Sequence, residues 1–230
     1  DLDSSLPEAM VVSQMSSGSA IKAILRPGAA AVSSLEASLS RLGESSVDVF
    51  LAPKLPLVPL RLVASGLAEQ IESGQTNYVG IRDLTSPRSL RRLCDYMELR
   101  DCKLMAAAFP YSLTNTKNED MIAACKECGV VPLITNPLDS GLASGRYTAT
   151  NPSGGMTEAK FSFKQLEKLQ PLHSVQETVA ERVRTRVRRT MRDTQERFKS
   201  KYGPPPKINT DITTTQIALN WVIAKGGVPL

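Results

Sequence analysis

Val47-Asp48-Val49-Phe50-Leu51-Ala52 and Tyr78-Val79-Gly80-Ile81 are two short apolar runs separated by one helical stretch. Both runs are continuous rather than alternating, which is typical of parallel strands covered on both faces. Between them, residues 61–73 carry apolar side chains at helical spacing, and Gly74 stands where a left-handed C-cap is favoured. The stretch therefore predicts a strand, a crossover helix and a second parallel strand.

The same rhythm extends in both directions along the chain. Further strands are predicted at residues 9–14, 104–108, 130–135 and 228–230, and further helices at 31–42, 88–98, 119–127 and 213–224. Ser86 and Pro87 fit the N-cap and first position of the helix that follows them. Strands alternating with amphipathic helices predict an α/β fold built on a parallel sheet.

Composition sets broad limits on the protein. The 230 residues are 41% hydrophobic, enough for a sizeable core, and we expect a single domain over 1–230. No run of about 18 apolar residues is present, so no membrane-spanning helix is expected. The chain starts at Asp1 without a signal-peptide pattern, and we expect a trimmed product or a piece of a longer chain.

A long basic helix is predicted at residues 172–202. Its apolar residues recur in steps of three and four, and Gly203-Pro204-Pro205-Pro206 would end it. Nine Lys and Arg fall between Arg182 and Lys201, in a chain of net charge +5. The candidate partner-binding residues are Arg182, Arg184, Arg188, Arg189 and Arg192.

Three interpretations of this basic helix remain open. A helix with an apolar stripe beside guanidinium groups suits an acidic protein partner in a larger complex. Phosphate contacts with a nucleic acid are less favoured, because few aromatic side chains for base stacking occur nearby. The third interpretation is a solvated helix that only covers the core.

Metal and thiol chemistry has weak support. Cys125-Lys126-Glu127-Cys128 is an isolated CxxC, and the only histidine, His173, lies 45 residues beyond it. We predict structural or free thiols rather than a redox pair, no metal site, and a solvated or capping role for His173.

Four segments resemble the aldo-keto reductase family. They are residues 34–43, 73–81, 137–148 and the run Gln216-Ile217-Ala218-Leu219-Asn220-Trp221-Val222, and the plastid-type plant and algal branch is the most similar. The resemblance implies a (β/α)8 TIM barrel that binds NADPH at the C-terminal ends of its strands. Order and spacing match strands three to eight, so the barrel is incomplete as given. Residues 172–206 would be an inserted basic helix and Pro-rich loop.

The resemblance also implies where catalytic and cofactor contacts would lie, and those positions hold different residues. The catalytic lysine and histidine of the family align with Met15 and Pro53. The nicotinamide contacts align with Arg82, Asp83, Ala108 and Thr135. Met15 cannot carry a charge, and Pro53 cannot donate a side-chain hydrogen bond. No catalytic set and no bound cofactor are therefore expected.

These observations predict a pseudoenzyme that serves as a structural, linker or binding subunit of a larger assembly. By resemblance we expect an organellar, plastid location, with the cytoplasm as the alternative. The alternative functions are an NADPH-dependent oxidoreductase with an atypical site, using NADP, and a basic nucleic-acid-associated protein.

Overall fold

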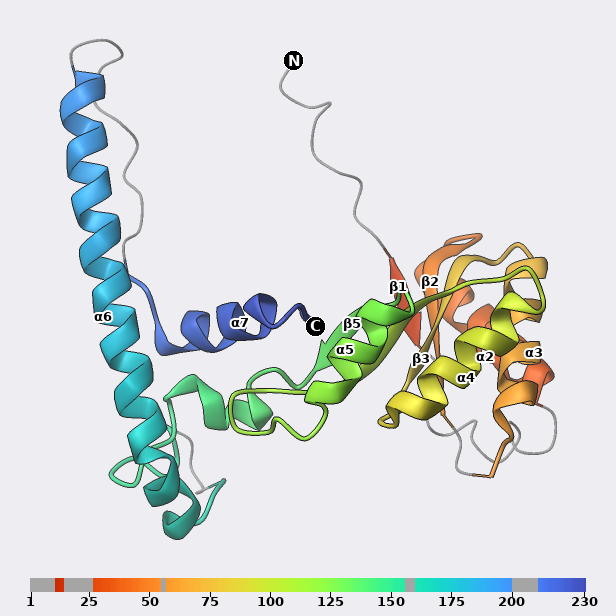
Figure 1. The fold of residues 1–230 in the computed structure, drawn as a ribbon, viewed down its shortest axis with the longest axis horizontal. Coiled ribbons are helices and arrows are strands. Elements are labelled where there is room, and N and C mark those ends of the chain that lie inside the picture. The colour runs from red at the N-terminus through yellow and green to blue at the C-terminus, as the bar shows by residue number, and fades with distance from the viewer. Residues whose placement is uncertain (1–10, 15–26, 55–56, 156–159, 200–210) are drawn as a thin grey trace.

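A computed structural model describes residues 11–14, 27–54, 57–155, 160–199 and 211–230. Six parallel strands form one sheet in consecutive order, β1 to β6, as Figure 1 shows. The strands are β1 Val12–Gln14, β2 Val47–Pro53, β3 Thr76–Arg82, β4 Leu104–Pro110, β5 Val131–Thr135 and β6 Val228–Pro229. Consecutive parallel pairing is the arrangement of a (β/α)8 barrel, and six such strands make part of one.

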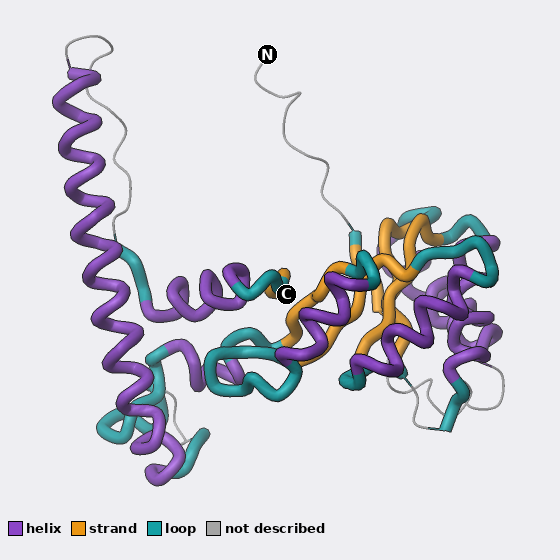
Figure 2. Tube along the Cα trace, in the orientation of Figure 1, coloured by secondary structure: helices purple, strands orange, loops and turns teal. Residues whose placement is uncertain are grey.

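Crossover helices connect the strands. They are α2 Pro27–Leu42, α3 Leu60–Glu72, α4 Pro87–Glu98, α5 Glu119–Glu127, α6 Phe163–Lys199 and α7 Thr214–Ala224, with a 3-10 turn η2 at Asp139–Ser144. The first four pack on one face of the sheet, and α6 stands at the far end of the molecule from α2 to α4 (Figures 1 and 2). The molecule is therefore elongated, with the sheet between two helical ends.

The main core fills the space between the sheet and α2 to α5. Phe50, Ile81 and Phe109 point outward from the strands into this core, where Leu67 and Leu93 meet them from the helices. All five side chains are buried. Burying large apolar side chains contributes about 1.5–3 kcal/mol each, so this layer dominates the stability of the fold.

A smaller cluster lies on the other face of the sheet, which would be the interior of a barrel. It consists of Val49, Leu51, Ala106, Ala108 and Leu133. Gly80 allows this packing, because a Cβ at that position would collide with Leu51 and lie 2.7 Å from the Ala106 carbonyl oxygen. A glycine in a strand often marks such a close approach.

Most predicted elements are confirmed, including the Ser86 cap, whose hydroxyl accepts a hydrogen bond from the Ser89 N–H. The long helix begins at Phe163 instead of residue 172. Ser162 and Gln165 explain the earlier start, since each side chain accepts a hydrogen bond from the other residue's backbone N–H. Pro171 lies inside the helix without ending it. Residues 200–206 lie outside the described ranges.

Candidate functional site

The candidate cofactor positions gather along one edge of the sheet. Pro53 pairs with Arg82, and Arg82 pairs with Ala108 on the next strand. Thr135 ends β5 beside Pro110 of β4. These are the C-terminal strand ends, where barrel enzymes place their sites. The sequence therefore identified residues that meet in space, although Met15 lies outside the described residues.

Arg82 and Asp83 form an ion pair at this edge. The Arg82 Nη1 and Asp83 Oδ2 atoms are 2.7 Å apart, and the Asp83 N–H donates to the Ala108 carbonyl at 3.0 Å. Asp83 has φ 64°, a left-handed conformation that Asp adopts more readily than most residues. A guanidinium-carboxylate pair therefore occupies the position where the resemblance implies neutral contacts to a nicotinamide amide.

Ala108 and Pro53 offer little chemistry beside this ion pair. Ala108 is 1% exposed and its methyl group has no donor or acceptor. Pro53 is half-buried and has no side-chain hydrogen-bonding group. Neither of these two side chains therefore offers a hydrogen bond to a nicotinamide ring.

Lys54 belongs to the same edge and was missed by the sequence analysis. Its backbone N–H donates to the Arg82 carbonyl at 2.8 Å, and its Nζ donates to the Val58 carbonyl at 3.0 Å. Burial lowers the pKa of Lys54 below its ordinary value. A lone lysine inside the apolar stretch 47–60 was the available signal, because a charge in such a run needs a partner.

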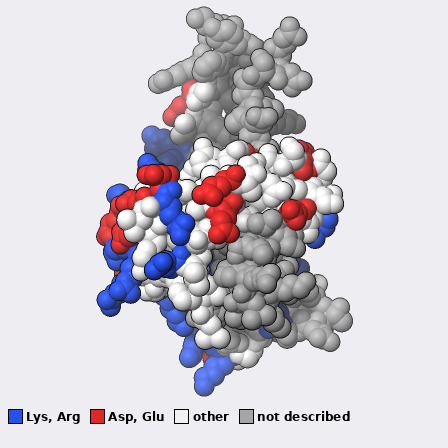
Figure 3. Space-filling view, turned by 90° about the vertical axis from the view of Figure 1, so that its right-hand side faces the viewer, with Lys and Arg blue, Asp and Glu red and all other residues white. Residues whose placement is uncertain are grey.

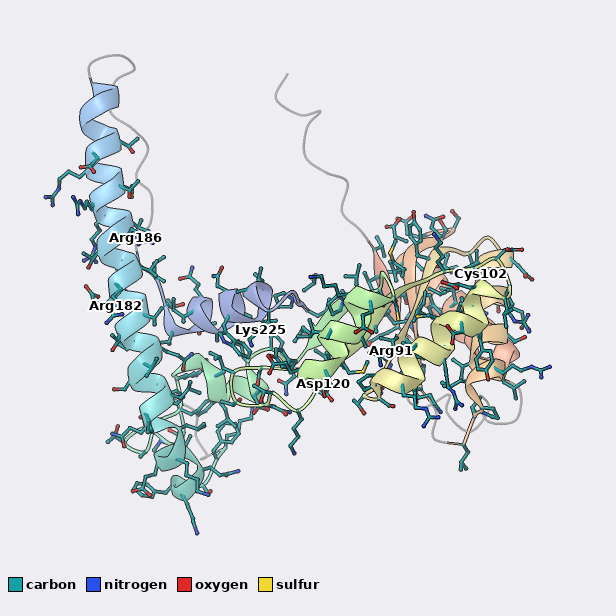
Figure 4. All side chains as sticks on the ribbon, viewed as in Figure 1. Arg91, Cys102, Asp120, Arg182, Arg186 and Lys225 are labelled. Carbon is teal, nitrogen blue, oxygen red and sulfur yellow. The ribbon has the colours of Figure 1, made fainter. Side chains whose placement is uncertain are left out.

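The basic helix is a separate feature. The N-terminal part of this helix contacts η2 and α7 through hydrogen bonds to backbone carbonyls. His173 Nε2 lies 2.8 Å from the Leu142 oxygen, and Gln176 Nε2 donates to the Ala143 oxygen at 2.8 Å. His173 therefore contacts the body of the protein rather than solvent alone. Figure 4 shows Arg182 and Arg186 further along the same helix, away from the sheet.

The structure places Arg184 in contacts within the chain. Its Nε donates to the Ile212 carbonyl at 2.8 Å, and its Nη1 pairs with Glu177 at 2.7 Å and Glu181 at 2.9 Å. The guanidinium is thus engaged within the chain, and only 18% of the side chain is exposed. The other four predicted partner-binding residues are exposed: Arg182, Arg188, Arg189 and Arg192.

The apolar stripe of α6 is also not its main packing face. Among the α6 side chains that the structure describes, Leu166, Gln176 and Ala180 are buried, whereas Val175 is 60% exposed and Val179 is 36% exposed. In contrast to the basic α6, the end of the molecule formed by α2 to α4 carries both acidic and basic side chains on its surface (Figure 3).

The cysteines lie close together between α4 and α5. Burial raises the pKa of Cys94 to about 12, and contact with Cys128 adds to the shift. Burial also raises the pKa of Cys125 to about 12. Thiols with such pKa values stay protonated at neutral pH and react slowly. Within the described ranges, no three His, Cys, Asp or Glu side chains converge as a metal site requires.

Comparison with known proteins identifies the class. Residues 21–230 match the aldo/keto reductase family, and the chain belongs to that family. Solved structures agree on the fold. A thermostable aldo-keto reductase in complex with the inhibitor epalrestat superposes with a TM-score of 0.53 at 20% identity, over 88% of this chain and 55% of that one. The fold is therefore a partial aldo-keto reductase barrel.

A second solved structure and two curated relatives extend the comparison. Glycerol dehydrogenase from Gluconobacter oxydans superposes with a TM-score of 0.56 at 19% identity, over 88% of this chain and 54% of that one. The chloroplastic pyridoxal reductase of Arabidopsis thaliana is 27% identical over 86% of this chain and 48% of its own length. L-glyceraldehyde 3-phosphate reductase of Escherichia coli is 29% identical over 50% of this chain and 34% of its own length. The chain thus spans about half or less of these relatives.

No helix in the described ranges has both the length and the apolar composition that a bilayer span requires.

Proposed function

We propose that this chain is a non-catalytic aldo-keto-reductase-like protein that acts as a structural, linker or binding subunit of a larger assembly. The observation that carries the proposal is the Arg82–Asp83 ion pair at the C-terminal edge of the sheet, beside Pro53 and Ala108. A general acid or base must reach the proton that it transfers, and such groups typically contribute about 10²–10⁴-fold to a rate. Pro53 and Ala108 cannot supply one.

The helix α6 supports the second half of the proposal. It has 37 residues, whereas the other α-helices have 9 to 16. Its length is therefore about 55 Å. Beyond residue 187, Arg188, Arg189 and Arg192 are exposed among the residues that the structure describes. Cationic side chains in that position suit an acidic protein surface. Such charge pairing would set the orientation and the association rate of the complex more than its affinity.

Turnover tests the non-catalytic half of the proposal. We expect no NADPH oxidation with a panel of aldehydes, assayed beside an active aldo-keto reductase. The proposal would be overturned if the parent protein oxidises NADPH and the Lys54→Ala variant does not, because that result would show catalysis at this edge.

Retention in the native assembly tests the binding half. We expect charge reversal of Arg188, Arg189 and Arg192 to Glu to weaken retention, and the parent to be retained less well as salt is raised. The matched control reverses Arg88, Arg92 and Arg100 of the α4 end, which changes the net charge equally. Equal retention of both triple variants would contradict a partner on α6.

An oxidoreductase with an atypical site is the alternative function. The curated relatives are named as reductases, and Lys54 places an amine with a lowered pKa at the same edge. Saturable NADPH binding that weakens in the Lys54→Ala variant would favour this alternative. A plastid location is part of the proposal, since one relative is chloroplastic, and fractionation of the source cells would test it.

A further inference from the structure

A groove lies between α6 and α7. Its volume is about 680 Å³, and its walls are Val175 and Val179 from α6, and Ile217 and Trp221 from α7. Leu113, from the loop after β4, also contributes to the lining. None of the described residues that line the groove is charged. The apolar stripe of α6 therefore faces an open groove rather than the core.

The apolar walls are exposed and firmly placed. Val175 and Val179 are 60% and 36% exposed. Trp221 stacks on the buried Tyr111 ring, with centroids 5.3 Å apart and planes inclined by 16°. From Leu172 to Val183 the α6 wall spans about 16 Å, or three helical turns. A groove of this length with apolar walls fits the apolar face of an amphipathic helix.

One polar atom in the groove lacks a partner. Gln176 is 2% exposed, and its Nε2 donates to the carbonyls of Ala143 and Thr214. These two acceptors fix the orientation of the amide, and the Oε1 atom then has no hydrogen-bond partner. A buried acceptor without a donor is destabilising, so this part of the groove wall is not optimised for the free chain.

The free rim of the groove is basic. At about 100° per residue, Arg182 lies roughly 60° to one side of Val179, and Gln176 lies roughly 60° to the other. Arg186 continues the rim on the next turn, and both arginines are exposed. An occupant with acidic side chains along one edge would complement this rim.

We propose that the groove between α6 and α7 docks an amphipathic helix of a protein partner. The apolar face of that helix enters between Val179 and Trp221, and its acidic edge meets Arg182 and Arg186. The inference rests on the proposed binding function and identifies the chemistry of the partner.

A synthetic peptide tests the groove directly. The probe is a labelled amphipathic helix of about four turns, with Leu at positions i, i+3, i+4 and i+7 and Glu along one edge. Fluorescence anisotropy with the full chain should show saturable binding. A scrambled peptide of the same composition should bind at least about tenfold more weakly.

Matched variants separate the groove from the rest of the surface. Val175→Asp with Val179→Asp should weaken binding at least about tenfold, whereas Leu57→Asp with Leu99→Asp, at exposed apolar positions elsewhere, should not. Arg182→Glu with Arg186→Glu should weaken binding more than Arg188→Glu with Arg192→Glu on the opposite side of α6. Circular dichroism verifies that each variant is folded.

Three outcomes would overturn the inference. The first is equal binding of the designed and scrambled peptides, and the second is full binding by the Val175 and Val179 double variant. The third is self-association of the chain that depends on Val179, which would place a second copy in the groove. If the groove variants stay in the native assembly while the Arg188, Arg189 and Arg192 variant is lost, this inference alone fails. If every variant is retained, the proposed binding function fails too.

Discussion

Gly80 determines how closely β3 approaches its neighbours. We expect Gly80→Ala to lower the free energy of unfolding by about 1–3 kcal/mol, because the added methyl group would overpack the interior face. It would meet Leu51 and lie 2.7 Å from the Ala106 carbonyl oxygen, and backbone yields less easily than a side chain. Urea denaturation measures the change. Unchanged stability would show that this face is loosely packed.

The partly buried thiol of Cys94 and the buried thiol of Cys125 should make stability depend on alkaline pH. Their pKa values are raised from 9.0 to about 12 in the folded protein. Between these values the folded state binds more protons than the unfolded state, so stability falls as pH rises. The stabilisation is fully present below about pH 9 and is lost as pH approaches 12.

Urea unfolding at pH 8 and pH 10 checks this expectation. The parent should lose more stability between the two values than a Cys94→Ala, Cys125→Ala double variant. An equal loss in both proteins would mean that these thiols titrate normally. Slow labelling of the parent by a thiol reagent at pH 8 is the accompanying expectation.

The strand ends could be predicted from the sequence, but the contacts between individual side chains could not. Pro53, Ala108 and Thr135 could be placed because each ends a distinct apolar run. The Arg82–Asp83 pair depends on the left-handed backbone at Asp83, which no pattern in the chain encodes. Lys54 was missed because its partners are backbone carbonyls of β3 and a nearby loop.

Hydrogen bonds anchor α6 to the rest of the chain between His173 and Arg184. The side chains of His173, Gln176 and Arg184 hold this part to backbone carbonyls. We expect Arg184→Ala to raise the hydrogen-exchange rate of amides in residues 176–184, because it removes the contact with Ile212. Arg188→Ala is the control and should leave these rates unchanged. Equal rates in both variants would show that Arg184 does not anchor the helix.

The sequence predicted that α6 exists but did not show which of its faces packs on the rest of the chain. Valines at steps of four were the visible signal, yet the buried face is formed by Leu166, Gln176 and Ala180. Gln and Ala carry little hydrophobic signal, and the hydrogen bonds of Gln176 reach residues 33 and 38 positions away. Periodicity shows that a helix has an apolar side, but not which element covers that side.

For the whole molecule, the alternation of apolar runs with amphipathic helices predicted a parallel sheet, and the six strands do pair in consecutive order. The rhythm could not predict the elongated shape, in which α6 stands apart from the sheet (Figure 1). That shape depends on where α6 crosses η2 and α7, a matter of long-range packing. It also separates the basic surface of α6 from the altered edge of the sheet.

We propose that the sheet edge of this aldo/keto reductase family member does not hold a nicotinamide cofactor. Calorimetric titration of NADPH into the full chain tests it most directly. We predict no saturable heat at micromolar protein, because Arg82 and Asp83 pair with each other and Ala108 offers no hydrogen bond. A dissociation constant on the order of micromolar or tighter, about −8 kcal/mol of binding free energy, would contradict the account.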